Sequence, residues 1–275
     1  MYIYKFSYTL KRFIFLGLLI LVFFDSYGFQ IHQSNKFFKN DTIINCEFLK
    51  KQEFLEYNIK VGLVTVGRVN FRKSFCEDSK LINAEIVGYT KGLGKLFFDL
   101  NVNYESYFMD QEYTPIKFIK SIYENGNKKQ EEIYFNNKYK KAYYRNTKVT
   151  KGKVFFYKNK LFDLVSAIYL FRSKTYNNNK YTSKIQIPYL HNGNGIKKLR
   201  FDFVGIDTIK NSKTLIKTKK YLCVFDSKNK LFQNKNEVYF WVSDDEYNIP
   251  IIIETRTKLS KIKIELINYP YEFFK

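Results

Sequence analysis

The sequence predicts a mainly β protein. Its strands are expected to form a curved, largely antiparallel sheet of the sandwich or open-barrel type, with one short buried helix near residues 163–172. Three observations lead to this prediction. Residues 237–258 show the pattern of a β-hairpin, strand-like segments recur at short intervals along the chain, and a single apolar helical segment interrupts them.

The hairpin pattern begins with strict alternation in residues 237–243. Val238, Phe240 and Val242 share one face of this segment, and Tyr239 and Trp241 share the other. Successive side chains of a strand point to opposite faces, so this spacing has the period of a strand and not of a helix. The segment therefore predicts a strand with aromatic residues on both faces.

A polar turn and a return strand follow. Asp244 and Asp245 begin a short polar run that ends at Asn248, and side chains of these types bond the local backbone in turns. Pro250 then starts the return strand, where its missing N–H group does little harm. A bound cation is the alternative for the two acids, but they lack the spacing of a calcium loop.

The first long strand pattern covers residues 57–72. Most of its odd positions are apolar, but Gly62 and Gly67 interrupt the alternation. Glycine inside a strand marks a bulge, a sharp bend or a close backbone approach, so we expect a bent strand or a strand pair. A phosphate-binding loop is disfavoured because no helix and no Gly-Lys-Ser/Thr sequence follow.

Short strands fill most of the remaining chain. They are predicted at 81–90, 99–109, 115–124, 129–136, 138–146 and 151–157, and then at 181–190, 197–207, 214–226, 236–243, 249–258 and 261–269. Gly126 and Gly152 lie near the joints between them, as turn residues do. No linker divides the series, so residues 48–275 are predicted to form a single β-rich domain.

The predicted helix has the sequence DLVSAIYLFR. Asp163 is a good N-cap residue, and Arg172 lies at the other end of the segment. The residues between them are apolar nearly all round the helix, which predicts a helix buried against the sheet. Ser166 lies in this helix without a G-x-S-x-G elbow, so a buried helical serine is favoured over a nucleophile.

The chain is strongly basic, with a formal net charge of +21, yet its composition disfavours a nucleic-acid partner. Only seven of its 47 basic residues are arginines, the side chain on which base and phosphate recognition relies most. The chain is also rich in Asn, Ile, Phe and Tyr, and AT-rich codons explain these residues together with lysine. The charge still favours anionic surfaces at low salt.

Residues 1–28 are predicted to be a secretory signal peptide. Lys5, Lys11 and Arg12 precede a twelve-residue apolar core at 13–24, and Gly28 provides a small residue for cleavage. The core is shorter than the ~20 residues of a spanning helix. We therefore expect export to the periplasm or cell envelope, a loose N-terminal arm at 29–47, and peripheral rather than integral membrane association.

Residues for metal or cofactor chemistry are scarce. The two histidines, His32 and His191, have no evident partners in the sequence. Cys46, Cys76 and Cys223 form no C-x-x-C pair, and their pairing into a disulfide is left open. No metal ligand set and no cofactor are predicted.

Three carboxylates offer a weak basis for hydrolysis. Asp99, Glu105 and Asp110 lie in or beside one predicted strand and include a candidate acid–base pair. Such residues are common at the strand ends of soluble proteins. No catalytic residue is assigned, and a non-enzymatic role is favoured.

Several stretches in combination resemble a known family. They are Glu56–Gly62 with Gly67, Tyr104–Tyr107, Pro115–Phe118, Glu124–Gly126, Asp163–Ala167 with Tyr169 and Arg172, and Trp241–Asp245 with Ile249-Pro250. Over about residues 50–270 the chain resembles the bacterial exported family catalogued as domain of unknown function 3108. It departs from the pattern at Gln52-Glu53, where relatives often have Gly-Glu before the first strand.

The resemblance implies a soluble, curved antiparallel β structure similar to a periplasmic capsule-assembly fold, and it carries over no catalytic residues. Bent sheets of this type include lipoprotein carriers that hold acyl chains. The first hypothesis is therefore an envelope protein that binds an apolar or amphipathic ligand, such as lipid or lipid-linked glycan. The ligand contacts named for it are Tyr57, Gly62, Gly67, Tyr104, Tyr169 and Trp241. The alternatives are a structural or assembly module that binds another envelope protein, and a glycan hydrolase.

Overall fold

The computed structural model describes residues 53–147, 149–177, 180–212, 214–225, 237–256, 260–267 and 269. The first half of its sheet contains β1 (Glu53–Val61), β2 (Val64–Cys76), β3 (Leu81–Thr90), β4 (Leu100–Met109), β5 (Pro115–Glu124), β6 (Asn127–Asn136), β7 (Lys141–Asn146) and β8 (Val149–Phe156). The second half contains β11 (Lys184–Leu190), β12 (Ile196–Asn211), β13 (Thr214–Phe225), β14 (Glu237–Ser243), β15 (Pro250–Arg256) and β16 (Lys261–Leu266). The remaining elements are α2 (Leu93–Phe97), α3 (Leu164–Lys174), η2 (Asn192–Asn194) and the small pair β9 (Tyr176–Asn177) and β10 (Lys180–Tyr181).

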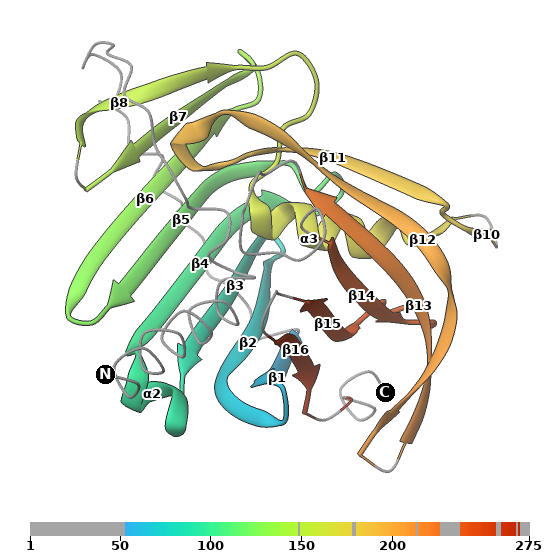
Figure 1. The fold of residues 1–275 in the computed structure, drawn as a ribbon. Coiled ribbons are helices and arrows are strands. Elements are labelled where there is room, and N and C mark those ends of the chain that lie inside the picture. The colour runs from blue at the N-terminus through green and yellow to red at the C-terminus, as the bar shows by residue number, and fades with distance from the viewer. Residues whose placement is uncertain are drawn as a thin grey trace.

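Fourteen strands form one continuous sheet in the order β11-β12-β13-β14-β15-β16-β1-β2-β3-β4-β5-β6-β7-β8. The two halves join where β1 pairs antiparallel with β16. Figure 1 shows the sheet curving around α3, with β8 and β11 as its two edges. The sheet is thus curved and antiparallel but not closed, which confirms the predicted fold class.

The first long strand pattern resolves into the hairpin β1–β2. Gly62 has φ +60° in the turn, a conformation that favours glycine. The register between the two strands shifts at Ile59/Lys60, which is the signature of a bulge. A Cβ atom on Gly67 would lie 2.5 Å from the carbonyl oxygen of Tyr89 on β3, so only glycine fits this approach. The expectation of a strand pair with glycines at a bend is confirmed.

Alternating burial along the strands places the core on the inner face of the sheet. In β1, Leu55, Tyr57 and Ile59 are buried while the residues between them are partly exposed. Their neighbours on β16, Ile264 and Leu266, are buried in the same way. The period-2 pattern of the sequence therefore corresponds to one buried and one more polar face.

Helix α3 fills the inner side of the curved sheet. The ring of Phe171 stacks on Phe201 of β12 with 3.8 Å between centroids. The same ring makes edge contacts with Tyr221 of β13 at 5.3 Å and with Phe240 of β14 at 5.7 Å. Burial of one phenylalanine of this kind contributes roughly 2–3 kcal/mol. The short buried helix predicted near 163–172 is confirmed, with its end two residues later at Lys174.

One helix was not expected from the sequence. The sequence predicts no element between the strands at 81–90 and 99–109, but the short helix α2 begins at Leu93. It packs on β2 so closely that a Cβ atom on Gly94 would lie 2.0 Å from the carbonyl oxygen of Val66.

The predicted signal peptide, the N-terminal arm and Cys46 lie outside the described residues. Within the described residues, no helix has the length and apolar character to cross a membrane.

Candidate functional site

The N-terminus of α3 is fixed by a capping box. The carboxylate of Asp163 accepts hydrogen bonds from the backbone N–H groups of Val165 and Ser166, and from the hydroxyls of Ser166 and Ser106. The Ser166 hydroxyl in turn lies 3.2 Å from the backbone nitrogen of Asp163, which donates to it. Burial raises the pKa of Asp163 to about 6, against the effect of these hydrogen bonds. Asp163 and Ser166 thus anchor the helix start to β4.

A buried ion pair joins α3 to the first strand. The guanidinium of Arg172 donates to both carboxylate oxygens of Glu53, at 2.8 and 2.6 Å. The hydroxyl of Tyr169 donates to the same carboxylate at 3.0 Å. Burial alone would raise the pKa of Glu53, but the charge and hydrogen bonds of Arg172 outweigh burial and hold this pKa below its usual value.

The same arginine holds the turn between β14 and β15. Arg172 donates to the backbone carbonyls of Tyr247 and Asn248, at 3.1 and 3.0 Å. Within the turn, the carboxylate of Asp245 accepts from the backbone N–H groups of Tyr247 and Asn248 and from the Ser243 hydroxyl. The turn leads directly into Pro250, which begins β15. The predicted turn chemistry is therefore present.

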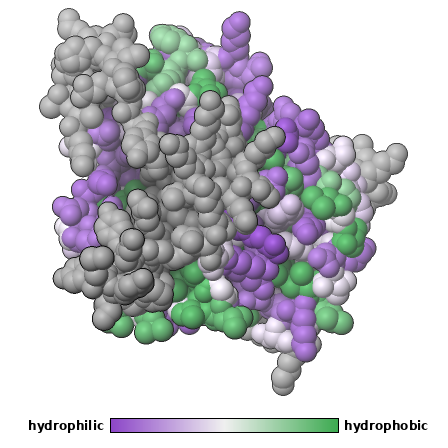
Figure 2. Space-filling view, in the orientation of Figure 1, coloured by the Kyte–Doolittle hydropathy of each residue, from purple (hydrophilic) through white to green (hydrophobic). Residues whose placement is uncertain are grey.

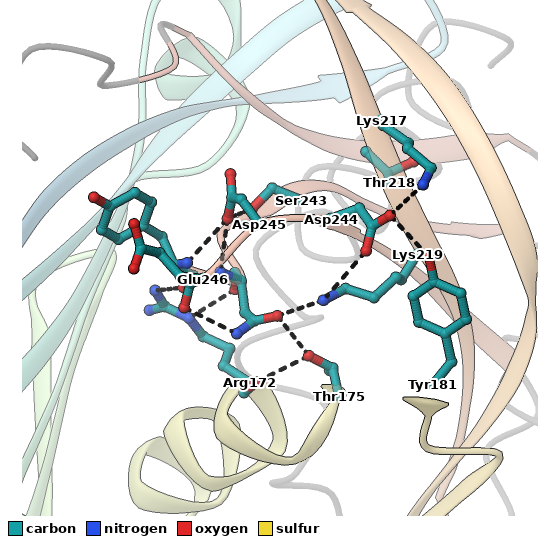
Figure 3. Close-up of polar contacts among 12 residues, drawn as sticks. Arg172, Thr175, Tyr181, Lys217, Thr218, Lys219, Ser243, Asp244, Asp245 and Glu246 are labelled. Atoms are coloured by element: carbon teal, nitrogen blue, oxygen red, sulfur yellow. Dashed lines mark hydrogen bonds and ion pairs between the residues drawn. The ribbon is translucent and has the colours of Figure 1, made fainter. Parts of the chain in front are cut away.

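A second branch of this polar network reaches β13 (Figure 3). The ammonium of Lys219, which is buried, lies 3.9 Å from the carboxylate of Asp244 and donates to the side chain of Asn248. Lys217 and Tyr181 also donate to Asp244, at 2.8 and 2.9 Å. The network satisfies its own charges and ties the helix end to β13 and the β14–β15 turn, which is a structural role.

All three tyrosines named as ligand contacts lie in the core. Tyr57 and Tyr104 are buried on β1 and β4, and Tyr169 is buried on α3. The ammonium of Lys120 lies over the ring of Tyr104, 5.6 Å from its centroid. Their role in ligand binding stays a prediction, and they do not line either surface pocket described below.

The other three named residues lie apart from one another. Gly62 is in the β1–β2 turn, and Gly67 is at the bulge beside β3. Trp241 points to the outer face of β14, away from α3, where its indole N–H donates to Asp207 at 3.0 Å. The structure does not bring the six named residues into one site.

An apolar groove lies at the seam between the two edges of the open sheet. We call it the seam groove; its cavity volume is about 560 Å³, within the range of small-molecule sites. It is lined by Phe156, Tyr157, Lys158, Asn159, Lys160, Leu161, Gln186, Pro188, Ile196 and Lys198. Phe156 is 69% exposed and Ile196 is 43% exposed, so the groove presents two large apolar side chains to solvent. Figure 2 shows hydrophobic residues gathered near the end of β8.

The charged residues that line the seam groove are all lysines. Lys158, Lys160 and Lys198 are exposed, and no acid is among the described lining residues. Lys160 lies 3.0 Å from the carboxylate of Glu112, but both side chains are more than half exposed, so solvent weakens the pair. The groove thus combines an apolar floor with a cationic rim.

The backbone of β11 is only partly covered at this seam. The N–H group of Phe162 donates to the carbonyl of Pro188, and the N–H group of Leu190 donates to the carbonyl of Phe162. Backbone groups of alternate residues in a strand point the same way, so those of Gln186 also point away from β12. They face the lining of the seam groove.

Sequence reasoning did not single out any seam-groove residue. Phe156 and Ile196 are separated by forty positions and occur in strand patterns like many others, so neither carries a local signal.

The candidate acids for hydrolysis do not form a catalytic pair in the described geometry. Glu105 points away from the core on β4 and accepts hydrogen bonds from Asn83 and Tyr107. Asp110 lies in the exposed turn after β4. Among the described residues, no group of three or more His, Cys, Asp or Glu side chains is arranged to hold a metal ion.

The cysteines differ from one another. Cys76, at the end of β2, is disulfide-bonded. Cys223 on β13 is a free thiol, and burial raises its pKa above the usual value. A buried thiol with a raised pKa has little thiolate character and therefore low reactivity.

Comparisons with known proteins agree with the fold. The crystal structure of a beta-barrel-like protein of domain of unknown function DUF1849 from Brucella abortus is similar, with a TM-score of 0.52 and 8% sequence identity. The match covers 78% of this chain and 95% of that chain, and at this identity it shows a shared fold alone. No curated protein matches the sequence.

The family model described as "Protein of unknown function (DUF3108)" matches residues 56–267. That range contains β2 and most of β1, the capped helix α3 and the β14–β15 turn, the same stretches that carry the resemblance in the sequence. The chain belongs to the DUF3108 family.

Proposed function

We propose that this protein is an exported, non-enzymatic carrier or receptor for an amphipathic ligand, and that the seam groove binds it. The observation that carries the proposal is the combination of an apolar groove of about 560 Å³ with three lysines at its rim. An acyl chain would cover Phe156 and Ile196, which are otherwise exposed to water. An anionic headgroup would pair with the lysines.

The ligand class follows from this chemistry. Lipids and lipid-linked glycans carry phosphate groups beside their apolar chains, and phosphate pairs well with lysine. The ligand would enter from the open edge of the sheet, because α3 and the core side chains already fill its inner face. Export is supported by the signal-like residues 1–28 and by the disulfide at Cys76, since disulfides persist in oxidising compartments.

Calorimetric titration of the mature protein with lysophosphatidylglycerol, below its micelle concentration, tests this proposal. The double variant Phe156→Ser/Ile196→Ser is expected to bind at least about tenfold more weakly, because it removes apolar contact area. Leu215→Ser is the matched control, since Leu215 is equally exposed, at 69%, but lies on β13 outside the groove. Equal affinity in the double variant and the control would contradict the proposal.

The lysines are tested separately. Lys158→Gln/Lys198→Gln is expected to weaken binding of lysophosphatidylglycerol, and added salt should weaken it further in the wild type. Binding of zwitterionic lysophosphatidylcholine should change little. An equal loss of affinity for both lipids in the lysine variant would show that the rim charges do not select the headgroup.

A second candidate function rests on the backbone of β11. The outward N–H and C=O groups of Gln186 could pair with an extended segment of another envelope protein, which would add a strand to the sheet. Gln186→Pro removes the outward N–H group without touching the bonds to β12. A stable protein complex that this variant loses, together with no binding of lysolipid, would favour an assembly module instead.

A further inference from the structure

The outer face of β14 and β15 carries a second hollow, on different residues from the seam groove. Its cavity volume is about 540 Å³. It is lined by Lys220, Glu237, Tyr239, Trp241, Glu254, Thr255, Arg256 and Lys261. We call it the outer hollow. None of these residues lines the seam groove, so the two sites can be tested independently.

Two aromatic rings form one wall of the outer hollow. Tyr239 and Trp241 lie side by side on β14, with 6.1 Å between ring centroids and 44° between their planes. The ammonium of Lys220 lies 4.9 and 4.6 Å from the two centroids. The hydrogen bond from the indole to Asp207 fixes the orientation of the Trp241 ring. The orientation of the Trp241 ring is therefore fixed, but the Lys220 ammonium covers the two rings and Trp241 is only 8% exposed, so a ligand that packs on this wall must displace the ammonium.

The rest of the lining mixes hydrogen-bond donors and acceptors. It contains the carboxylates of Glu237 and Glu254 and the cations of Lys220, Arg256 and Lys261. Glu254 and Lys261 lie 2.7 Å apart and pair with each other. With three cations and two carboxylates, the lining has an excess of one positive charge. A purely apolar ligand would take water away from these charged groups without offering them hydrogen bonds in exchange, which is costly.

A sugar ring matches this combination. One face of a pyranose presents C–H groups that can pack on aromatic rings, while its hydroxyls both donate and accept hydrogen bonds. The positive excess favours a sugar that also bears a carboxylate. We propose that the outer hollow binds an acidic saccharide unit, with Tyr239 and Trp241 as the packing wall and Arg256 as the partner of the sugar carboxylate.

Trp241 makes this proposal directly testable, because it is the only tryptophan of the chain. Its fluorescence reports on the outer hollow alone. Titration with a glucuronic-acid disaccharide is expected to change the emission saturably, and a neutral glucose disaccharide should bind several-fold more weakly. Lysophosphatidylglycerol in the seam groove should leave the emission unchanged, so failure of one site does not imply failure of the other.

Two variants keep the reporter and test the assigned contacts. Tyr239→Ala is expected to weaken binding about tenfold, near the upper end for one aromatic contact. Arg256→Gln should weaken binding of the acidic disaccharide only. Tyr123→Ala is the matched control, because Tyr123 is a 47% exposed tyrosine on β5, remote from the hollow. No saturable change in emission would overturn the proposal, as would equal affinities for Tyr239→Ala and the control. Equal affinities for the acidic and neutral sugars would overturn the assignment of an acidic unit.

Discussion

Replacement of Arg172 by methionine is the sharpest test of how this fold is held together. Arg172 makes two hydrogen bonds to Glu53 and two to backbone carbonyls of the β14–β15 turn. It therefore connects the first strand, the only long helix among the described residues, and the turn that contains Asp244 and Asp245. Methionine keeps most of the side-chain volume and removes only the charge and the donors.

The expected loss is large because both partners are buried. The side chains of Arg172 and Glu53 are only 7% and 4% exposed. Removing one partner of a buried pair costs about 3–5 kcal/mol, chiefly because the remaining charge stays buried and unpaired. For a domain of this size that corresponds to a fall in Tm of roughly 6–20 °C.

The destabilisation caused by Arg172→Met depends on pH, and the direction of this dependence follows from the pKa of Glu53. In the wild type the pKa of Glu53 is lowered, so its contribution to stability is present above the usual carboxyl range and is lost as pH falls through the lowered pKa. Without Arg172, burial dominates and raises the pKa of Glu53, so the variant gains relative stability as the carboxyl takes up a proton. The stability gap between wild type and variant should therefore narrow between about pH 7 and pH 5.

Urea unfolding followed by circular dichroism at several pH values provides the measurement. Arg200→Met is the matched control, because Arg200 pairs with Asp202 at the surface, with side chains 43% and 35% exposed, and should cost less than about 1 kcal/mol. The double variant Glu53→Gln/Arg172→Met should regain part of the loss. A loss of unfolding free energy in Arg172→Met no greater than in Arg200→Met would show that the buried ion pair does not stabilise the fold. A stability difference from the wild type that does not narrow at low pH would show the same.

Three further predictions concern the cap, a glycine and the cysteines. Asp163→Ala should lower the free energy of unfolding by about 2 kcal/mol and Asp163→Asn by less, as measured by urea unfolding, because asparagine can still cap the helix. The pKa of Asp163 in the folded protein is raised to about 6, so the folded state holds its proton at pH values where the unfolded state has lost it. The free energy of unfolding of the wild type should therefore fall relative to that of Asp163→Asn as pH rises from about 4 to 7. A difference in free energy that does not change with pH would contradict this prediction. Gly67→Ala should destabilise the protein more than Gly126→Ala in thermal unfolding, because a Cβ atom at position 67 would lie 2.5 Å from a β3 backbone oxygen, whereas at position 126 a Cβ atom has open space and meets only the backbone strain of a positive φ of +85°. In the denatured protein, peptide mass spectrometry should find Cys223 alkylated without reduction and Cys76 only after it; labelling of Cys76 without reductant would disprove its disulfide.

Much of the fold could be predicted because its signals are local. The alternation around Phe240 and Trp241, the turn at Asp244 and the cap at Asp163 each depend on residues only a few positions apart. The structure contains all three. Helix α2 escaped prediction because its five residues include a glycine, and only packing against Val66 makes a helix there favourable.

The sites could not be predicted in the same way, because they depend on strand register and on how the open sheet curves. Glu53 and Arg172 are 119 positions apart, and no local pattern relates them. Lys220 lies over Trp241 only because β13 and β14 pair in a particular register. The seam groove exists because β8 and β11 approach without pairing, which is a property of the whole sheet. Composition indicated aromatic and basic residues, but not where they meet.

Native mass spectrometry of the protein purified from its native cells, at low and at high salt, shows directly whether it carries an amphipathic ligand. We expect a bound amphipathic molecule of defined mass that survives high salt, because the apolar floor of the seam groove holds it. The Phe156→Ser/Ile196→Ser variant should lose this molecule. A bare protein mass under both conditions, or the same bound mass on the variant, would contradict ligand binding in the seam groove.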